Sequence, residues 1–188
     1  TGLAVCRIDG HQSGHGYRHS YHQVCSLVMA KNKTPMTQAI RALKHHKIKF
    51  VPKPYKYEEK GGTKISAREL GVDEYHVIKT LVMEDDQGQP LIVLMHGTCE
   101  VSLKHLARQL KVKQISPCAP EKADRLTGYQ TGGISPFGTK QEIPVYVEES
   151  ILGLETICIN GGKRGLLVEI EPQALVKILN PTPVSVAI

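Results

Sequence analysis

Two β-rich runs joined by a short polar segment constrain the fold of this chain more than any other feature. The runs read HVIKTLVM, residues 76–83, and PLIVLMHG, residues 90–97, and the segment EDDQGQ lies between them. Aliphatic and β-branched runs on either side of a short polar loop are typical of a β-hairpin. A hairpin makes its two strands antiparallel, so the sequence predicts a sheet organised around an antiparallel pair.

Shorter helices and strands are expected on both sides of this hairpin. Helices are predicted from Met36 to about Ile48 with Thr37 as N-cap, at residues 66–70, from Ser102 to Leu110, in PEKADRL (120–126) and from Pro172 to about Leu179. Strands are predicted in KFVPKPY (49–55), VKQIS (112–116), IPVYVEE (143–149), ETICIN (155–160) and LLVEI (166–170). The prolines of KFVPKPY restrict that strand to a sheet edge. We therefore predict a mixed α/β domain with a largely antiparallel sheet and surrounding helices.

The first 33 residues differ in composition from the rest of the chain. They carry four histidines, His11, His15, His19 and His22, and glycines interrupt any helix that would align them. A metal-binding tract is one interpretation, and a disordered or non-native leader is the other, which we favour. We predict an N-terminal appendage over residues 1–33 and one domain over residues 34–188.

Charge and cysteine content narrow the class of protein. The formal net charge of +6 allows contact with a polyanion such as RNA, but Trp is absent and Phe occurs twice, so few such aromatic side chains are present for nucleic-acid bases to stack on. Five cysteines without a C-x-x-C pair make a poor disulfide or zinc framework and favour reduced thiols in a cytoplasmic protein. We expect no bound metal and no cofactor. No apolar run approaches the ~20 residues that span a bilayer, and the start lacks the order of a signal peptide.

The segment YQTGGISPFG, residues 129–138, is the first candidate for chemistry. A serine nucleophile elbow needs a backbone N–H after the serine, but Ser135 is followed by Pro136, which has none. The remaining functional interpretation is a loop whose N–H groups near Gly132 and Gly133 bind a carbonyl oxygen or a phosphate. A tight turn without a ligand explains the glycines equally well.

Basic residues give two further candidates. Lys163 and Arg164, inside INGGKRG, either grip phosphate or lie solvated in a hairpin turn. Lys79 lies within an apolar strand, where it either contacts an anion in a cleft or simply faces water. We find no paired carboxylates and no metal-binding motif, so an enzyme built from this chain would rely on positioning and on backbone electrostatics.

Four segments together resemble the YbaK/EbsC group of the prolyl-tRNA editing family. They are MTQAIRALKHHKIKF (36–50) with Tyr55 shortly after, IKTLVM (78–83), TGYQTGGISPFG (127–138), and ETICINGGKRGLLVEI (155–170) with the final helix. The resemblance runs in order from Met36 to about Leu179 and does not include the first 33 residues. It implies the fold of the prolyl-tRNA synthetase editing domain.

The resemblance also implies a function. Similarity to this group implies a trans-acting deacylase in the cytoplasm that clears mischarged Cys-tRNA(Pro), and also Cys-tRNA(Cys), with prolyl-tRNA synthetase as a transient partner and with neither DNA nor a membrane involved. The thiol of the substrate itself is implied as the nucleophile, which forms a thiolactone. The alternatives are an Ala-tRNA(Pro) deacylase and a non-catalytic module that holds a tRNA 3′ end or a nucleotide.

The resemblance also implies roles for individual residues. Lys79, Gly132 and Gly133 are implied as catalytic residues, with Lys79 holding the terminal adenosine and its phosphate and the glycine loop holding the ester carbonyl. The implied substrate-binding residues are Tyr55, Ile134, Ser135, Pro136, Gly162, Lys163 and Arg164. Some relatives carry an aspartate at the position of Leu167, so a polar contact from that position is missing here.

Overall fold

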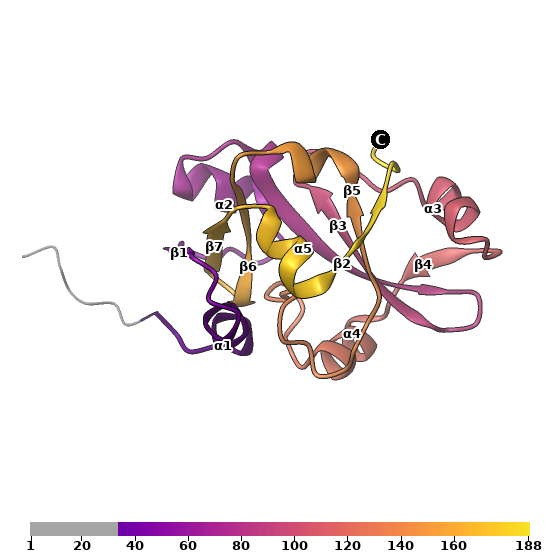
Figure 1. Ribbon diagram of the computed structural model, residues 1–188, viewed down its shortest axis with the longest axis horizontal. Coiled ribbons are helices and arrows are strands. Elements are labelled where there is room, and N and C mark those ends of the chain that lie inside the picture. Colours follow the sequence, from indigo (N-terminus) through magenta and orange to yellow (C-terminus); the bar gives the residue numbers. More distant parts are fainter. Residues whose placement is uncertain (1–33) are drawn as a thin grey trace, which may run out of the picture. The chain divides into compact units, whose positions relative to one another are not determined.

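The predicted hairpin lies at the centre of an eight-stranded sheet (Figure 1). The structure is a computed structural model that describes residues 34–188, and the histidine-rich segment 1–33 lies outside the described residues. The strands are β1 (Val51–Pro54), β2 (Val77–Asp85), β3 (Pro90–His96), β4 (Ile115–Pro117), β5 (Val145–Glu148), β6 (Ile157–Lys163), β7 (Leu166–Ile170) and β8 (Thr182–Val184). Their order across the sheet is β1-β7-β6-β2-β3-β5-β8, and β4 pairs with β2.

The strand pairings are mixed in direction. Four are antiparallel, namely β1·β7, β2·β3, β2·β4 and β6·β7, and three are parallel, namely β2·β6, β3·β5 and β5·β8. The predicted mixed α/β fold with a mainly antiparallel sheet is confirmed. As predicted, the proline-containing β1 lies at a sheet edge, where it pairs only with β7.

The edge of β2 that faces away from β3 is shared by two other strands. β6 pairs with β2 only at Val77 and Ile78, whereas β4 pairs with it from Met83 to Asp85. The segment 79–82 therefore has β3 along one edge and no strand of the described chain along the other. This gap in the sheet positions the candidate site.

In residues 34–188, five α-helices and two short 3₁₀ segments surround the sheet. The helices are α1 (Gln38–His45), α2 (Gly62–Leu70), α3 (Leu103–Leu110), α4 (Pro120–Thr127) and α5 (Gln173–Leu179), and the 3₁₀ segments are Glu74–His76 and Glu149–Gly153. Thr37 caps α1 as predicted, because its hydroxyl accepts the N–H of Ile40 at 3.1 Å and donates to the carbonyl of Gly161. None of the helices within residues 34–188 has the length and apolar character needed to cross a bilayer.

The helices divide between the two faces of the sheet. Even-numbered residues of the hairpin, such as Ile78 and Leu94, pack with α1, α4 and α5 in the largest apolar cluster. Odd-numbered neighbours, such as Met83 and Met95, pack with α3, and Val77 packs with α2. This alternation follows from the two-residue period of a strand.

The structure differs from the sequence prediction at several places, and α2, for example, begins at Gly62, four residues before the predicted start. Strand β8, whose sequence is TPV, was not predicted, because three residues that include a proline carry little strand signal. Strand β6 continues through the predicted GGKRG turn to Lys163, with an irregularity in the pairing between Asn160 and Lys163. Ser102 occupies the N-cap position of α3, but its side chain makes no capping hydrogen bond.

Candidate active site

A cavity of about 810 Å³ lies at the gap beside β2. Its size falls within the usual range for small-molecule sites, about 300–1,000 Å³. Its walls come from β2, from the start of α2, from the glycine loop after α4 and from the β6–β7 turn. Five residues predicted for the site line this cavity: Tyr55, Lys79, Gly132, Ile134 and Arg164.

Lys79 extends from β2 into the cavity wall. Its ammonium group donates to the backbone carbonyl of Cys99 at 2.8 Å. An ammonium group has three donors, so two N–H bonds of Lys79 are available to an anion once this contact is made. The side chain of Lys79 is partly buried and lines the cavity, which agrees with the interpretation in which it contacts an anion in a cleft.

The glycine loop lies beside the same cavity. Gly132 has φ of +87°, a conformation that favours glycine, and a Cβ there would lie 2.9 Å from the hydroxyl of Tyr57. Within residues 34–188, no hydrogen-bond partner is found for the N–H groups of Gly132 and Ile134. Because both residues line the cavity, these N–H groups are able to bind an oxygen of a ligand.

Gly133 has a different role from the one expected. Its N–H donates to the carbonyl of Gln130 at 2.8 Å, so this donor is already engaged inside the loop. A Cβ at Gly133 would lie 2.7 Å from the backbone nitrogen of Arg164. Glycine is therefore needed here for the close packing of the loop against the β6–β7 turn.

Arg164 fastens that turn to the glycine loop. Its Nε and Nη2 atoms both donate to the carbonyl of Thr131, at 2.9 and 2.7 Å. Its guanidinium carbon lies 5.3 Å from the centre of the Tyr57 ring, within range of a cation–π interaction. Arg164 thus holds the loop and Tyr57 in place beside the cavity.

Tyr55 follows the edge strand β1 and forms another part of the wall. Its backbone N–H donates to the carbonyl of Gly165 at 2.9 Å, which ties it to the β6–β7 turn. Burial raises the pKa of the Tyr55 phenol above its ordinary value, and the neighbouring Tyr57 adds to the effect. The phenol therefore stays protonated at neutral pH and is able to donate a hydrogen bond.

The structure does not bring the other predicted residues to the cavity. Ser135 is completely buried and its hydroxyl accepts the N–H of Phe137 at 3.4 Å, so it shapes the loop, as Pro136 beside it does. Gly162 packs against Tyr129, to which a Cβ would come within 2.7 Å. The lining residues include neither Gly133 nor Lys163, and Lys163 is exposed.

Several lining residues were missed by the sequence analysis. Thr63 and Glu74 are joined by a hydrogen bond of 2.7 Å, and Thr80 has a buried hydroxyl without a partner among the described residues. Tyr57 could have been found from its position two residues after Tyr55 on an extended segment. The others occur in no recognised motif.

Cys118 places a thiol in the cavity wall, but it is poorly suited to act as a nucleophile. Burial raises the pKa of this thiol above its ordinary value, and the Glu84 carboxylate raises it further. A thiol with a raised pKa is mostly protonated at neutral pH, and the thiolate is the reactive form. Among residues 34–188, no histidine lines the cavity either, so this part of the chain supplies no cysteine–histidine or serine–histidine pair there.

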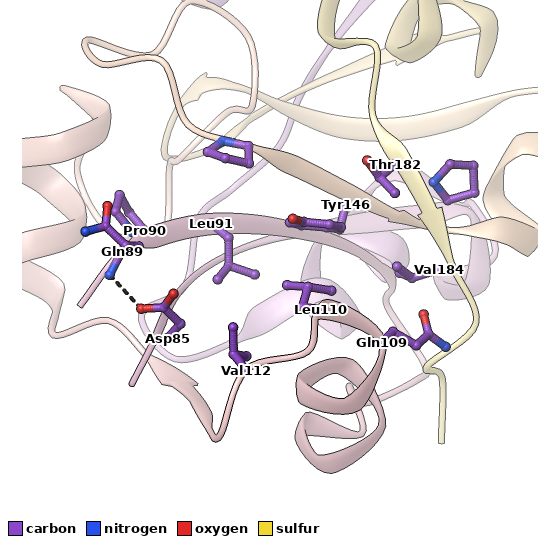
Figure 2. Close-up of a pocket in the computed structure, with 12 residues that line it drawn as sticks. Asp85, Gln89, Pro90, Leu91, Gln109, Leu110, Val112, Tyr146, Thr182 and Val184 are labelled. Carbon is purple, nitrogen blue, oxygen red and sulfur yellow. Dashed lines mark hydrogen bonds between the residues drawn. The ribbon is translucent and has the colours of Figure 1, made fainter. Parts of the chain in front are cut away.

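A second cavity, of about 440 Å³, lies where β3, β5 and β8 meet α3 (Figure 2). Its lining, as far as residues 34–188 form it, contains none of the predicted site residues and no lysine, arginine or histidine. Its carboxylate, Asp85, already accepts the N–H groups of Gln87 and Gln89, each at 2.9 Å. Compared with the cavity beside β2, it offers little for binding an anion. Elsewhere in residues 34–188, no group of three or more His, Cys, Asp or Glu side chains is arranged to hold a metal ion.

Comparisons with known proteins identify the family. Residues 61–178 match the family model described as "Aminoacyl-tRNA editing domain". The chain is 31% identical over 156 residues to a protein of Enterococcus faecalis named "Putative Cys-tRNA(Pro)/Cys-tRNA(Cys) deacylase EbsC", a match that covers 81% of this chain and 94% of that protein. It is also 22% identical over 104 residues to a proline–tRNA ligase of Limosilactobacillus fermentum, of which the match covers 18%.

Solved structures share the fold. One is "hypothetical protein APE2540", with a TM-score of 0.73, 21% sequence identity, and coverage of 80% of this chain and 99% of that chain. Another is described as "a putative trans-editing enzyme for prolyl tRNA synthetase", with a TM-score of 0.69, 23% identity, and coverage of 81% and 98%. The resemblance seen in the sequence is confirmed by these matches.

Proposed function

The chain belongs to the aminoacyl-tRNA editing domain family and is an ester-cleaving aminoacyl-tRNA deacylase, and we propose that it clears mischarged Cys-tRNA(Pro). Cys-tRNA(Cys) is included in the proposed substrates, since both esters appear in the name of the Enterococcus faecalis relative. We further propose that it acts in trans, in the cytoplasm, with prolyl-tRNA synthetase as a transient partner.

One observation supports this proposal above the others: Lys79, Gly132 and Tyr55 line a single cavity although the sequence separates them widely. Lys79 supplies a cation, Gly132 a backbone N–H without a partner in the described part of the chain, and Tyr55 a protonated phenol. This set suits an ester that is linked to an anionic nucleic acid. It lacks a side-chain nucleophile with an adjacent base, so the nucleophile must come from the substrate or from water.

The proposed reaction uses the thiol of the bound cysteinyl group. Its sulfur attacks the ester carbonyl carbon, a C–S bond forms, and the bond from that carbon to the ribose oxygen breaks. The ribose oxygen takes up the proton lost by the thiol, and the cysteinyl group leaves as a thiolactone. Negative charge develops on the carbonyl oxygen during the attack, and we propose that the N–H groups of Gly132 and Ile134, two lining residues, stabilise it.

The charges around the cavity support a tRNA substrate. Four cationic residues line it, namely Lys60, Lys64, Lys79 and Arg164, against two carboxylates, Glu59 and Glu74. An excess of cations near the opening attracts the phosphates at the end of a tRNA and makes binding dependent on salt. We propose that Lys60 and Lys64 contact the backbone there, while Lys79 contacts the terminal nucleotide.

The decisive experiment follows the loss of each ester from Cys-tRNA(Pro), Cys-tRNA(Cys) and Ala-tRNA(Pro) under the same conditions. We expect both cysteinyl esters to be cleaved with turnover, and Ala-tRNA(Pro) much more slowly because alanine has no thiol. S-methylcysteinyl-tRNA(Pro) serves as the control, since its side chain keeps the sulfur, with one added methyl group, and cannot form the thiolactone. Loss of none of the esters above the rate in buffer would disprove the proposal.

The other outcomes identify the alternatives. Faster cleavage of Ala-tRNA(Pro) than of Cys-tRNA(Pro) would assign the chain as an alanine editor. Salt-dependent binding of tRNA without any turnover would assign it as a binding module. Equal cleavage of the cysteinyl and S-methylcysteinyl esters would point to water as the nucleophile.

A further inference from the structure

The gap in the sheet leaves part of a strand edge open inside the cavity. Pairing of β2 with β6 ends at Ile78, and pairing with β4 begins at Met83. All of residues 77–83 line the cavity, together with Asn160 of β6 and Pro117 of β4. The cavity therefore occupies the place where another strand residue would continue the sheet.

The pairing of β2 with its neighbours determines which of its backbone N–H and C=O groups point into this gap. The N–H of Cys118 donates to the carbonyl of Val82 at 3.0 Å, on the side of β4. Backbone groups alternate in direction along a strand, so Thr80 and Val82 both direct their N–H and C=O groups away from β3. Within residues 34–188, no partner is found for the N–H or C=O of Thr80, nor for the N–H of Val82.

A second observation points to the same place. The side-chain hydroxyl of Thr80 is buried, and no residue in the described part of the chain forms a hydrogen bond with it. A buried polar group without a partner costs free energy, and such groups in natural proteins usually meet a ligand or water. Thr80 thus brings three polar groups that have no partner within residues 34–188 to one wall of the cavity.

We propose that this open edge of β2 recognises the base of the terminal adenosine of the tRNA substrate. The carbonyl of Thr80 accepts the 6-amino group of adenine, and the N–H of Val82 donates to N1. This carbonyl and this N–H, two residues apart on one edge, are the pair that a residue of a parallel strand would use. Adenine carries a donor beside an acceptor and satisfies both groups.

Other parts of the substrate fit this edge less well. The α-ammonium group of the amino acid has donors only and would leave the N–H of Val82 without a partner. Cytosine also carries an amino group beside a ring nitrogen, and the tRNA 3′ end, CCA, contains two cytosines. The terminal adenine is favoured because the ester is attached to its ribose and because Lys79 and Gly132 line the same cavity. This inference rests on the proposed tRNA substrate.

The test compares trinucleotides by NMR titration of the isotope-labelled protein. The probes are CCA, the same trinucleotide with purine in place of the terminal adenine, and a third in which the cytosines are replaced by 2-pyrimidinone. The purine removes only the 6-amino group of the adenine, and 2-pyrimidinone removes only the amino groups of the cytosines. No ester is present, so the result does not depend on deacylation.

We expect the purine probe to bind about tenfold more weakly than CCA, and the 2-pyrimidinone probe to bind like CCA. The amide signal of Val82 should shift with CCA, while that of Gln89, in the second cavity, should not. Equal affinity for CCA and the purine probe, binding of neither, or a loss only with 2-pyrimidinone would each overturn the inference.

A second experiment, which measures deacylation, distinguishes failure of this inference from failure of the proposed function. Cys-tRNA(Pro) that ends in purine riboside should show kcat/KM about tenfold below that of the adenosine-ended substrate. Equal rates would overturn the base recognition while leaving the deacylase intact. If the adenosine-ended ester is not cleaved at all, the proposed function fails, and the trinucleotide titration still decides whether the β2 edge binds adenine.

Discussion

At the scale of single residues, Lys79 is the side chain whose environment bears most directly on substrate binding. Its ammonium group is oriented by the carbonyl of Cys99 and keeps two donors for a ligand. We expect Lys79→Ala to lower kcat/KM for Cys-tRNA(Pro) by about a hundredfold, equivalent to about 2.7 kcal/mol. Melting temperature should change little, because Lys79 is not part of the apolar core.

A matched control for Lys79 removes the same charge elsewhere. Lys177 is exposed on α5 and does not line the cavity, so Lys177→Ala should keep kcat/KM within about twofold of the parent value. Full activity of Lys79→Ala, or equal losses in the two variants, would contradict the assigned anion contact.

Thr80 gives the second prediction at this scale, which concerns stability. Thr80→Val removes a buried hydroxyl without a partner and should raise the free energy of unfolding by about 1 kcal/mol, as measured by urea titration. Thr127→Val is the control, because that hydroxyl donates to Ala123 and accepts from Tyr129, and its loss should lower stability. Lower stability of Thr80→Val would show that its hydroxyl has a partner in the free protein.

The role of a single residue was easiest to predict from the sequence where that role depends on a backbone N–H, as it does at Pro136. Pro136 rules out a serine elbow from its chemistry alone, and the buried Ser135 agrees with this. Thr80 could not be predicted, because its importance comes from where β6 and β4 stop pairing, and the sequence does not contain that information.

At the scale of elements, the contact between the glycine loop and the β6–β7 turn controls the shape of the cavity. Gly133→Ala should lower the free energy of unfolding by about 1–3 kcal/mol, because its Cβ would meet the rigid backbone of Arg164. A thermal melt measures this loss. Gly153→Ala is the control, since a Cβ at Gly153 has nothing within 4 Å, and its melting temperature should be unchanged or higher. Equal melting temperatures for the two variants would contradict this role of Gly133.

Elements that depend on local pattern were predicted more reliably than those that depend on distant partners. The hairpin β2–β3 and the capped helix α1 agree with their sequence signals in position and type. The three parallel pairings and the short strand β8 involve segments joined by long connections, which leave no periodic signal in the sequence. The gap beside β2 results from those pairings, and so the cavity itself was not predictable.

At the scale of the whole molecule, we expect stability to fall at alkaline pH, because the phenol of Tyr129 and the thiol of Cys158 are buried. Burial raises the pKa of Tyr129 to about 12 and that of Cys158 to about 11, from ordinary values of 10.0 and 9.0. Both groups are neutral in the native state, so their contribution is fully present below about pH 9. It is lost as the pH rises, through 9–11 for Cys158 and through 10–12 for Tyr129.

Urea titrations at several pH values measure this effect. Tyr129→Phe should show a shallower fall of unfolding free energy between pH 10 and 12 than the parent protein, whatever its stability at pH 8. The comparison of slopes removes the contribution of lysines, which titrate in both proteins. Parallel curves for the two proteins would contradict the buried, neutral phenol.

The pairing of β1 with β7 also determines when a newly made chain can become an enzyme. Val51 pairs with Glu169, and the hydroxyl of Thr37 donates to Gly161, so the first elements of the described chain depend on nearly the last. Contacts so distant in sequence form late, because the intervening chain must be present first. Tyr55 and the glycine loop both contact the β6–β7 turn, so during translation the cavity is completed only after that turn has left the ribosome. A nascent chain that ends before β7 would therefore contain Lys79 and the glycine loop without a working site.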